Sequence, residues 1–292
     1  MSAKLTDNLM SLYAKSIERQ SEESRIRART YHRECALKLQ RLAKKGIVIV
    51  ADLISRLHQL SSREKNFVIY VIPTLKIQQA VSLLLDLLQD PAFRVSAAVA
   101  LSQLRPVKKV TQVFVDVGRR ELQSANPDRL WLEAVIHGIG HSDDPRATEI
   151  MLNIFEREDL PGWLRGDAGD KLGCCGRASD RRTTVFRRCL AAVLKGLDDS
   201  SIDVQFWSMY VMMQLATYIW YRQSGTATEF KSALPRLREI AAHDHRLAPG
   251  FWWPMAAEAQ DAIDCIKMGQ PAGPDAGERW EGNPERGATT RD

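Results

Sequence analysis

The chain has 292 residues, of which 45% are hydrophobic and 26% are charged, and its formal net charge is +5. This length and apolar content suffice to bury a continuous core. The five cysteines are odd in number and form no Cys-x-x-Cys pair, which excludes a disulfide framework and indicates a reducing compartment.

Residues 1–45 carry most of the positive charge. They hold eleven basic and five acidic side chains, an excess of six, against +5 for the whole chain. A basic cluster at Arg25, Arg27, Arg29 and Arg33 indicates contact with an anionic partner such as nucleic acid. The other interpretation is a solvated helix that caps the first hairpin. We expect residues 1–45 to form a basic N-terminal helical cap and, since they contain no apolar signal segment, a cytoplasmic location.

Residues 46–268 have helical periodicity throughout. Two apolar runs, 47–51 and 67–72, look strand-like in isolation, but both sit within helical spacing. The expected helices form pairs: 47–60 with 62–76, 79–89 with 92–104, 107–123 with 127–140, 143–158 with 162–173, 181–197 with 201–222, and 227–243 with 254–268. Residues 269–292 are rich in Gly, Pro and charge, which predicts a disordered tail.

The clearest pair is residues 143–173. Asp144 and Pro145 open an apolar helical pattern, a short polar break follows, and the second helix ends at Gly173. Small residues such as Ala168 permit close helix approach. A hairpin of this kind cannot bury its apolar stripe alone, so stacking of successive hairpins is expected.

A motif recurs at the turns of these pairs. An acidic residue in the loop is followed a few positions later by a basic residue, and then by small residues and a leucine on the second helix. The matching segments are Asp90-Pro91 with Arg94-Val95, Ala97, Ala98 and Leu101, and Asp159 with Leu164-Arg165, Ala168 and Leu172-Gly173. Residues 198–216 match less closely, with Val204-Gln205 where the pattern has a basic residue. This motif resembles bacterial HEAT-like repeats of the phycobilisome-lyase type. The resemblance implies an all-α fold, a right-handed α-solenoid of about six stacked antiparallel hairpins.

In HEAT-like repeats the second helices line a concave face that binds partners, and the motif residues often tie neighbouring repeats together. Both roles are open for Arg94, Arg165 and Asp167. The candidate partner-binding residues on the expected face are Trp131, His137, His141, Trp163, Arg165 and Lys171.

Glu133, His137 and His141 share one helix face because they are four residues apart. Two histidines are too few for a complete metal site, so a polar binding face and a plain structural role stay open beside metal binding. His243-Asp244-His245 falls in an expected turn, where turn chemistry explains it best.

No catalytic triad, phosphate loop or cofactor motif is visible, so we expect neither catalytic residues nor a cofactor. Residues 204–221 form an uncharged run, which we interpret as a buried helix rather than a membrane span.

Two function classes follow. The leading one is a non-enzymatic protein-interaction module, an adaptor or scaffold, for which the resemblance also offers toxin-neutralising immunity proteins. The alternative is a nucleic-acid-binding solenoid similar to alkylpurine DNA glycosylases. A phycobilin lyase rests on the repeat resemblance alone. A basic concave stripe would favour nucleic acid, whereas a mixed or acidic, partly apolar one would favour a protein partner.

Overall fold

The computed structural model describes residues 59–104, 108–142, 144–174, 182–222, 227–249 and 253–270, together with Arg41. Within these ranges eleven α-helices and short 3-10 turns account for the regular structure. The described residues contain no β-strand, and one isolated bridge joins Leu247 to Pro254. The prediction of an all-α fold is therefore confirmed for this part of the chain.

The chain divides into two compact units, Met1–Val110 and Thr111–Asp292. The helices of the first unit are α4 (Ser62–Thr74), η2 (Gln78–Ala80), α5 (Val81–Leu87) and α6 (Arg94–Gln103). Helices α4 and α5 both pack on α6, which buries Phe67 and Leu101. The strand-like run 67–72 lies inside α4, as its spacing predicts, whereas the run 47–51 and its expected helix lie outside the described residues.

The second unit holds the remaining helices in a long succession. They are α7 (Lys108–Gln123), α8 (Arg129–Ile139), α9 (Pro145–Glu156), α10 (Gly162–Cys174), α11 (Thr184–Gly196), α12 (Ile202–Arg222), η3 (Thr228–Ala233), α13 (Leu234–His243) and α14 (Met255–Met268).

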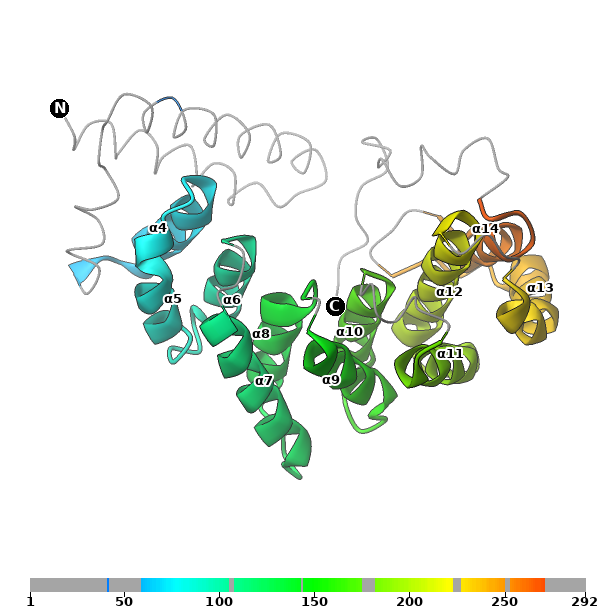
Figure 1. Cartoon of the computed structure of the whole chain (residues 1–292), viewed down its shortest axis with the longest axis horizontal. Coiled ribbons are helices and arrows are strands. Elements are labelled where there is room, and N and C mark those ends of the chain that lie inside the picture. The colour runs from blue at the N-terminus through cyan, green and yellow to red at the C-terminus, as the bar shows by residue number, and fades with distance from the viewer. Residues whose placement is uncertain are drawn as a thin grey trace. The chain divides into compact units, whose positions relative to one another are not determined.

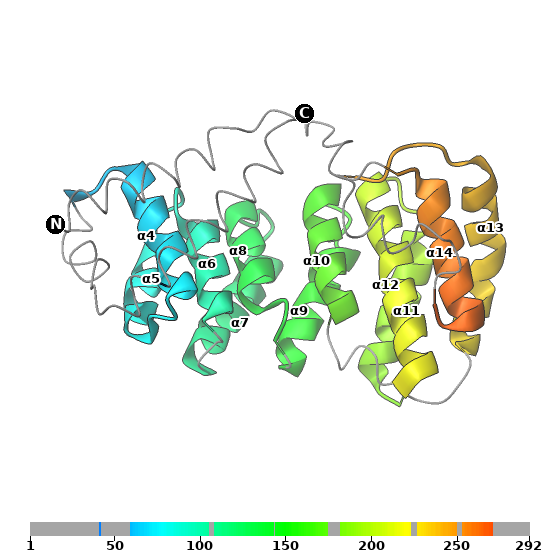
Figure 2. The same ribbon diagram turned by 90° about the horizontal axis from the view of Figure 1, so that it is seen from above.

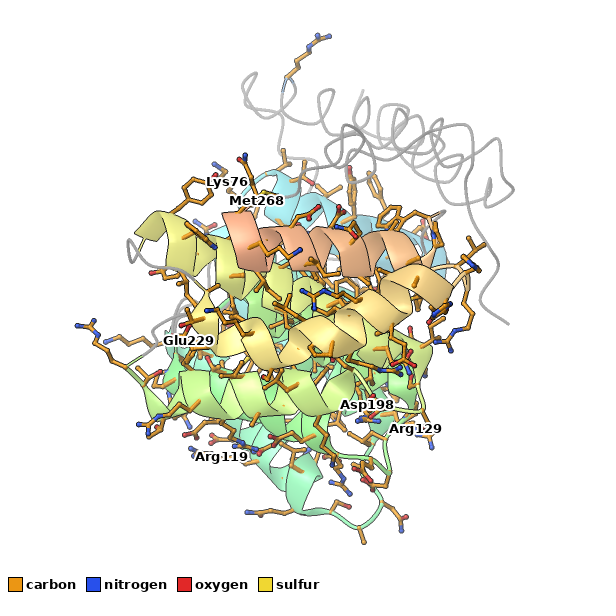
Figure 3. All side chains as sticks on the ribbon, turned by 90° about the vertical axis from the view of Figure 1, so that its right-hand side faces the viewer. Lys76, Arg119, Arg129, Asp198, Glu229 and Met268 are labelled. Atoms are coloured by element: carbon orange, nitrogen blue, oxygen red, sulfur yellow. The ribbon has the colours of Figure 1, made fainter. Side chains whose placement is uncertain are left out.

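These helices form two rows (Figures 1 and 2). One row runs α8, α10, α12 and α14, each packed on the next. In the other row α9 packs on α11, and α11 packs on η3. The rows are joined within the pairs α9–α10, α11–α12 and α13–α14, the last of which faces the viewer in Figure 3 with Met268 at the end of α14. This two-row packing is compatible with an α-solenoid.

Helix ends follow the local chemistry of the sequence. The Asp128 carboxylate accepts from the backbone of Leu130 and Trp131 at the start of α8, and Asp144 does the same for Arg146 at the start of α9. These contacts satisfy amides that the first turn leaves unbonded. Helix α14 ends at Gly269, whose φ of 79° is left-handed and suits glycine.

The buried arginines of the recurring motif tie the two helices of a hairpin together. Arg94 Nε donates to the Leu88 carbonyl over 3.0 Å, and Arg165 Nε donates to the Phe155 carbonyl over 2.9 Å. In both cases the arginine lies in the first turn of a second helix and reaches a carbonyl at or near the end of the first. Such carbonyls lack an intrahelical donor, so the guanidinium satisfies them.

A further set of hydrogen bonds joins successive hairpins at a regular sequence distance. The joined residues are 32 to 41 positions apart: Arg146 with Gln112, Arg157 with the carbonyls of Leu122 and Ser124, Arg165 with Asp199, Arg188 with Asn153 and Glu156, Lys195 with Glu158, and Arg246 with Gln205. This spacing matches the period of helical-hairpin repeats.

The predicted helices 79–89 and 227–243 each begin as a 3-10 turn. Residues 228–233 form η3, and α13 starts only at Leu234. Pro235 lacks a backbone N–H, which an α-helix can spare only in its first turn, so the helix starts anew there.

The uncharged run 204–221 belongs to α12, which packs between α10, α11 and α14. Its core-facing side chains are buried, among them Phe206 and Met212. In the described ranges no helix has both the length and the hydropathy that crossing a membrane requires.

Candidate partner-binding face

Helices α8, α10 and α12, each the second helix of its hairpin, carry aligned stripes of accessible or half-buried side chains. We call these stripes the second-helix face. Its members are Glu133, His137 and His141 on and just after α8, Trp163, Asp167, Asp170 and Lys171 on α10, and Asp203, Trp207, Tyr210 and Gln214 on α12. Residues three or four apart in sequence lie on one side of a helix, so each set forms a continuous stripe.

Glycines on α10 bring the stripes of α10 and α12 into direct contact. A Cβ at Gly166 would lie 2.6 Å from Trp207 Cδ1 and 3.1 Å from Asp203 Cβ. At Gly173 a Cβ would meet Tyr210 and Gln214 at ordinary contact distances of 3.5 and 3.4 Å. The absence of a side chain at Gly166 therefore creates the space that Trp207 occupies.

Trp207 and Tyr210 form an aromatic pair at the centre of this face. Their rings lie edge to face with centroids 5.2 Å apart, and Phe206 holds the other side of Trp207 in the same geometry at 5.0 Å. Trp207 and Tyr210 are half-buried, so their rings are fixed by packing yet partly accessible. Rings held in this way lose little entropy when a partner binds.

The face is acidic. Its carboxylates are Glu133, Asp167, Asp170 and Asp203, whereas Lys171 is its one ammonium group. Lys171 Nζ donates to Asp170 over 2.5 Å, and the side chains of this pair are 13% and 27% exposed. The pair neutralises one carboxylate.

Lys171 also connects α10 to the end of α8. A Cβ at Gly140 would lie 2.4 Å from Lys171 Cγ, so the lysine stem runs across this glycine. Burial lowers the pKa of His137 below its usual 6.5, and nearby Lys171 lowers the pKa further while Asp170 opposes both. Burial and Lys171 also lower the pKa of His141. Both imidazoles therefore favour the neutral form near neutral pH.

Two of the predicted site residues do not belong to the face. Trp131 is only 8% exposed, and the Arg120 guanidinium carbon lies 6.0 Å from its ring centroid. Arg165 is 6% exposed, and its guanidinium donates to Phe155 and to both carboxylate oxygens of Asp199. Arg165 therefore ties hairpins together, and the side chains of both predicted residues are buried.

The other four predicted residues, His137, His141, Trp163 and Lys171, do lie on the face. The tryptophan that the sequence interpretation missed is Trp207, together with Tyr210. The polar residues of the uncharged run 204–221 do not mark the accessible side of the helix, because Gln205 and Ser208 are buried and Gln214 is exposed.

Several other predicted features can be placed. Arg25, Arg27, Arg29 and Arg33 lie outside the described residues, as does Cys175. Asp244 accepts hydrogen bonds from the Arg246 backbone and guanidinium. This ion pair lowers the pKa of Asp244 and holds the segment that follows α13.

The described part of the chain contains no group of three or more His, Cys, Asp or Glu side chains placed to hold a metal ion.

Comparison of the chain with protein-family models, with curated proteins and with solved structures finds no match.

Proposed function

We propose that this chain is a non-enzymatic protein-interaction module, an adaptor or scaffold built as a right-handed HEAT-like α-solenoid of about six hairpins. The repeating bonds across 32 to 41 residues and the matching roles of Arg94 and Arg165 support the repeat architecture. In such a solenoid the second helices present the binding surface to a partner.

The observation that carries the proposal is the combination of carboxylates with a fixed aromatic pair on the second-helix face. Carboxylates pair with arginine and lysine side chains, and the ring faces of Trp and Tyr also attract these cations. Trp163, Trp207 and Tyr210 supply the aromatic surface that interaction sites favour. The partner that fits this face is therefore a basic segment of another protein. Neutralisation of a toxin through such a segment is one role of this class.

The alternative function, nucleic-acid binding, has less support from the face. Phosphates are attracted by lysine and arginine, whereas the residues named on the second-helix face include four carboxylates and one lysine. The residues that support the alternative function are the basic side chains of the N-terminal segment, Arg25, Arg27, Arg29 and Arg33. A glycosylase-like solenoid would instead require basic residues along the repeats.

One substitution distinguishes the two functions, because an added positive charge should weaken binding of a basic protein segment and strengthen binding of nucleic acid. Gln214 is exposed on the α12 stripe, so Gln214→Lys adds a positive charge with little effect on folding. Glu149→Lys on the exposed side of α9 is a charge-changing control away from the face. We expect nuclease-treated native cell extract to yield a protein partner on the tagged wild type and on Glu149→Lys, with several-fold less on Gln214→Lys. Stronger retention of nucleic acid on Gln214→Lys would instead support the alternative.

A further inference from the structure

A hollow of about 220 Å³ is lined by residues of α9, α10 and α11 together with Asp199. Its apolar lining consists of Phe155 from α9 with Ala191, Ala192 and Gly196 from α11; Ala191 is exposed, whereas Phe155 and Ala192 are only 1% and 6% exposed. The buried pair of Arg165 and Asp199 also lines it. The hollow thus lies where two successive hairpins meet.

Its size limits what can bind. Pockets for drug-sized molecules have volumes of roughly 300–1,000 Å³, whereas an engineered apolar cavity of about 150 Å³ holds benzene. A hollow of about 220 Å³ therefore suits a single ring or a branched aliphatic group. It is too small for a nucleotide or a tetrapyrrole.

Most charged groups around the hollow already satisfy one another. The Arg165 guanidinium bonds to Phe155 and Asp199, and Asp199 also accepts from the backbone of Ser201. The Glu156 carboxylate accepts two hydrogen bonds from Arg188. These groups give the ligand little to bond.

Lys195 differs from these groups. Its Nζ donates to Glu158 over 2.6 Å in a pair whose side chains are 75% and 68% exposed. An ammonium has three donors, so this bond uses one of them. Water screens an exposed ion pair of this kind, so a ligand can displace or share it at little cost.

We propose that the hollow binds a compact apolar carboxylic acid, with its ring or aliphatic group against Ala191 and Ala192 and its carboxylate on Lys195 Nζ. A phosphate dianion is disfavoured more strongly than a carboxylate monoanion because Glu156 and Asp199 line the hollow and Glu158 bonds to Lys195. The acid comes either from a free small molecule or from the C-terminal residue of a peptide. This inference does not depend on the proposed function of the second-helix face.

The test uses the full chain and 4-fluorophenylacetate as the probe, with fluorine NMR line broadening as the readout. We expect the acid to bind and the neutral 4-fluorophenylacetamide to bind about tenfold more weakly, the effect of losing one charge-assisted hydrogen bond. Lys195→Gln should weaken binding of the acid by a similar factor.

Pocket filling supplies an independent variant. Ala191 is exposed at the mouth, so Ala191→Leu should block the probe, whereas Ala242→Leu on exposed α13 should leave binding unchanged. Thermal melts establish that each variant is folded. Equal binding of acid and amide, no binding of either, or unchanged binding to Lys195→Gln would overturn the proposal.

The source of the carboxylate is resolved with short peptides ending in phenylalanine. Tighter binding of the free-acid peptide than of 4-fluorophenylacetate identifies a peptide C-terminus, and weaker binding identifies a free acid. In both cases the amidated peptide should lose binding by about tenfold, and a peptide indifferent to amidation would contradict the assigned role of Lys195.

Discussion

The Arg165–Asp199 pair should be the strongest single tie between hairpins. Arg165→Met keeps the side-chain length but removes the guanidinium, so the Asp199 carboxylate loses two of its donors and the Phe155 carbonyl loses its guanidinium donor. The side chains of the pair are 8% and 13% exposed, with a shortest N–O distance of 2.6 Å. Removing one partner of a buried ion pair costs about 3–5 kcal/mol, so we expect a loss of unfolding free energy in this range.

A matched control comes from the same pair of hairpins. Arg188 bonds to Asn153 and Glu156, and the side chains of the Arg188–Glu156 pair are 41% and 35% exposed. An accessible pair contributes about 0.2–1 kcal/mol, so Arg188→Gln should cost no more than that. Both variants break a bond between the same two hairpins, and they differ in burial.

Urea unfolding followed by circular dichroism measures both variants against the wild type, with the slope of the transition as a check on two-state behaviour. A cost for Arg165→Met within about 1 kcal/mol of that for Arg188→Gln would refute the reasoning, because burial would then not control the strength of the tie.

Three other predictions concern particular contacts. Gly166→Ala should destabilise the fold by about 1–3 kcal/mol because its Cβ would lie 2.6 Å from Trp207 Cδ1, whereas Gly173→Ala, with open contact distances, should stabilise α10 by up to about 1 kcal/mol; urea unfolding of the two variants tests the contrast. Burial lowers the pKa of His137 below 6.5, so the unfolded chain binds the proton first as pH falls. Stability should therefore decline below about pH 6.5, and less so in His137→Gln, when unfolding is compared at about pH 7.5 and 5.5. Burial raises the pKa of Cys265 to about 12, so peptide mapping after alkylation at about pH 8 should find this thiol modified only in denaturant.

The helices were predictable because their signals are local. Asp144 and Pro145 mark a helix start, Gly269 marks a helix end, and the structure has both at the expected positions. Pro235 also indicates that an α-helix starts next to it rather than at residue 227. The apolar periodicity of the surrounding residues nevertheless predicted one continuous helix over 227–243.

The candidate site was harder to predict because accessibility depends on packing between hairpins. Trp131 and Trp163 look equivalent in sequence, yet the first is buried beside Arg120 and the second remains half-buried on the face. Trp207 becomes part of the face only because Gly166 of another hairpin leaves room for it. Both relationships join residues of different helices, and periodicity within a single helix does not contain them.

The most direct test of the proposed binding face places a photo-crosslinking amino acid, p-benzoylphenylalanine, at Gln214 and, as the control, at Glu149. Both positions are exposed on helices, one on the second-helix face and the other on α9. The account predicts crosslinks from position 214 to a basic segment of a particular protein, and none to that protein from position 149. Crosslinks from position 214 to nucleic acid, or the same products from both positions, would contradict it.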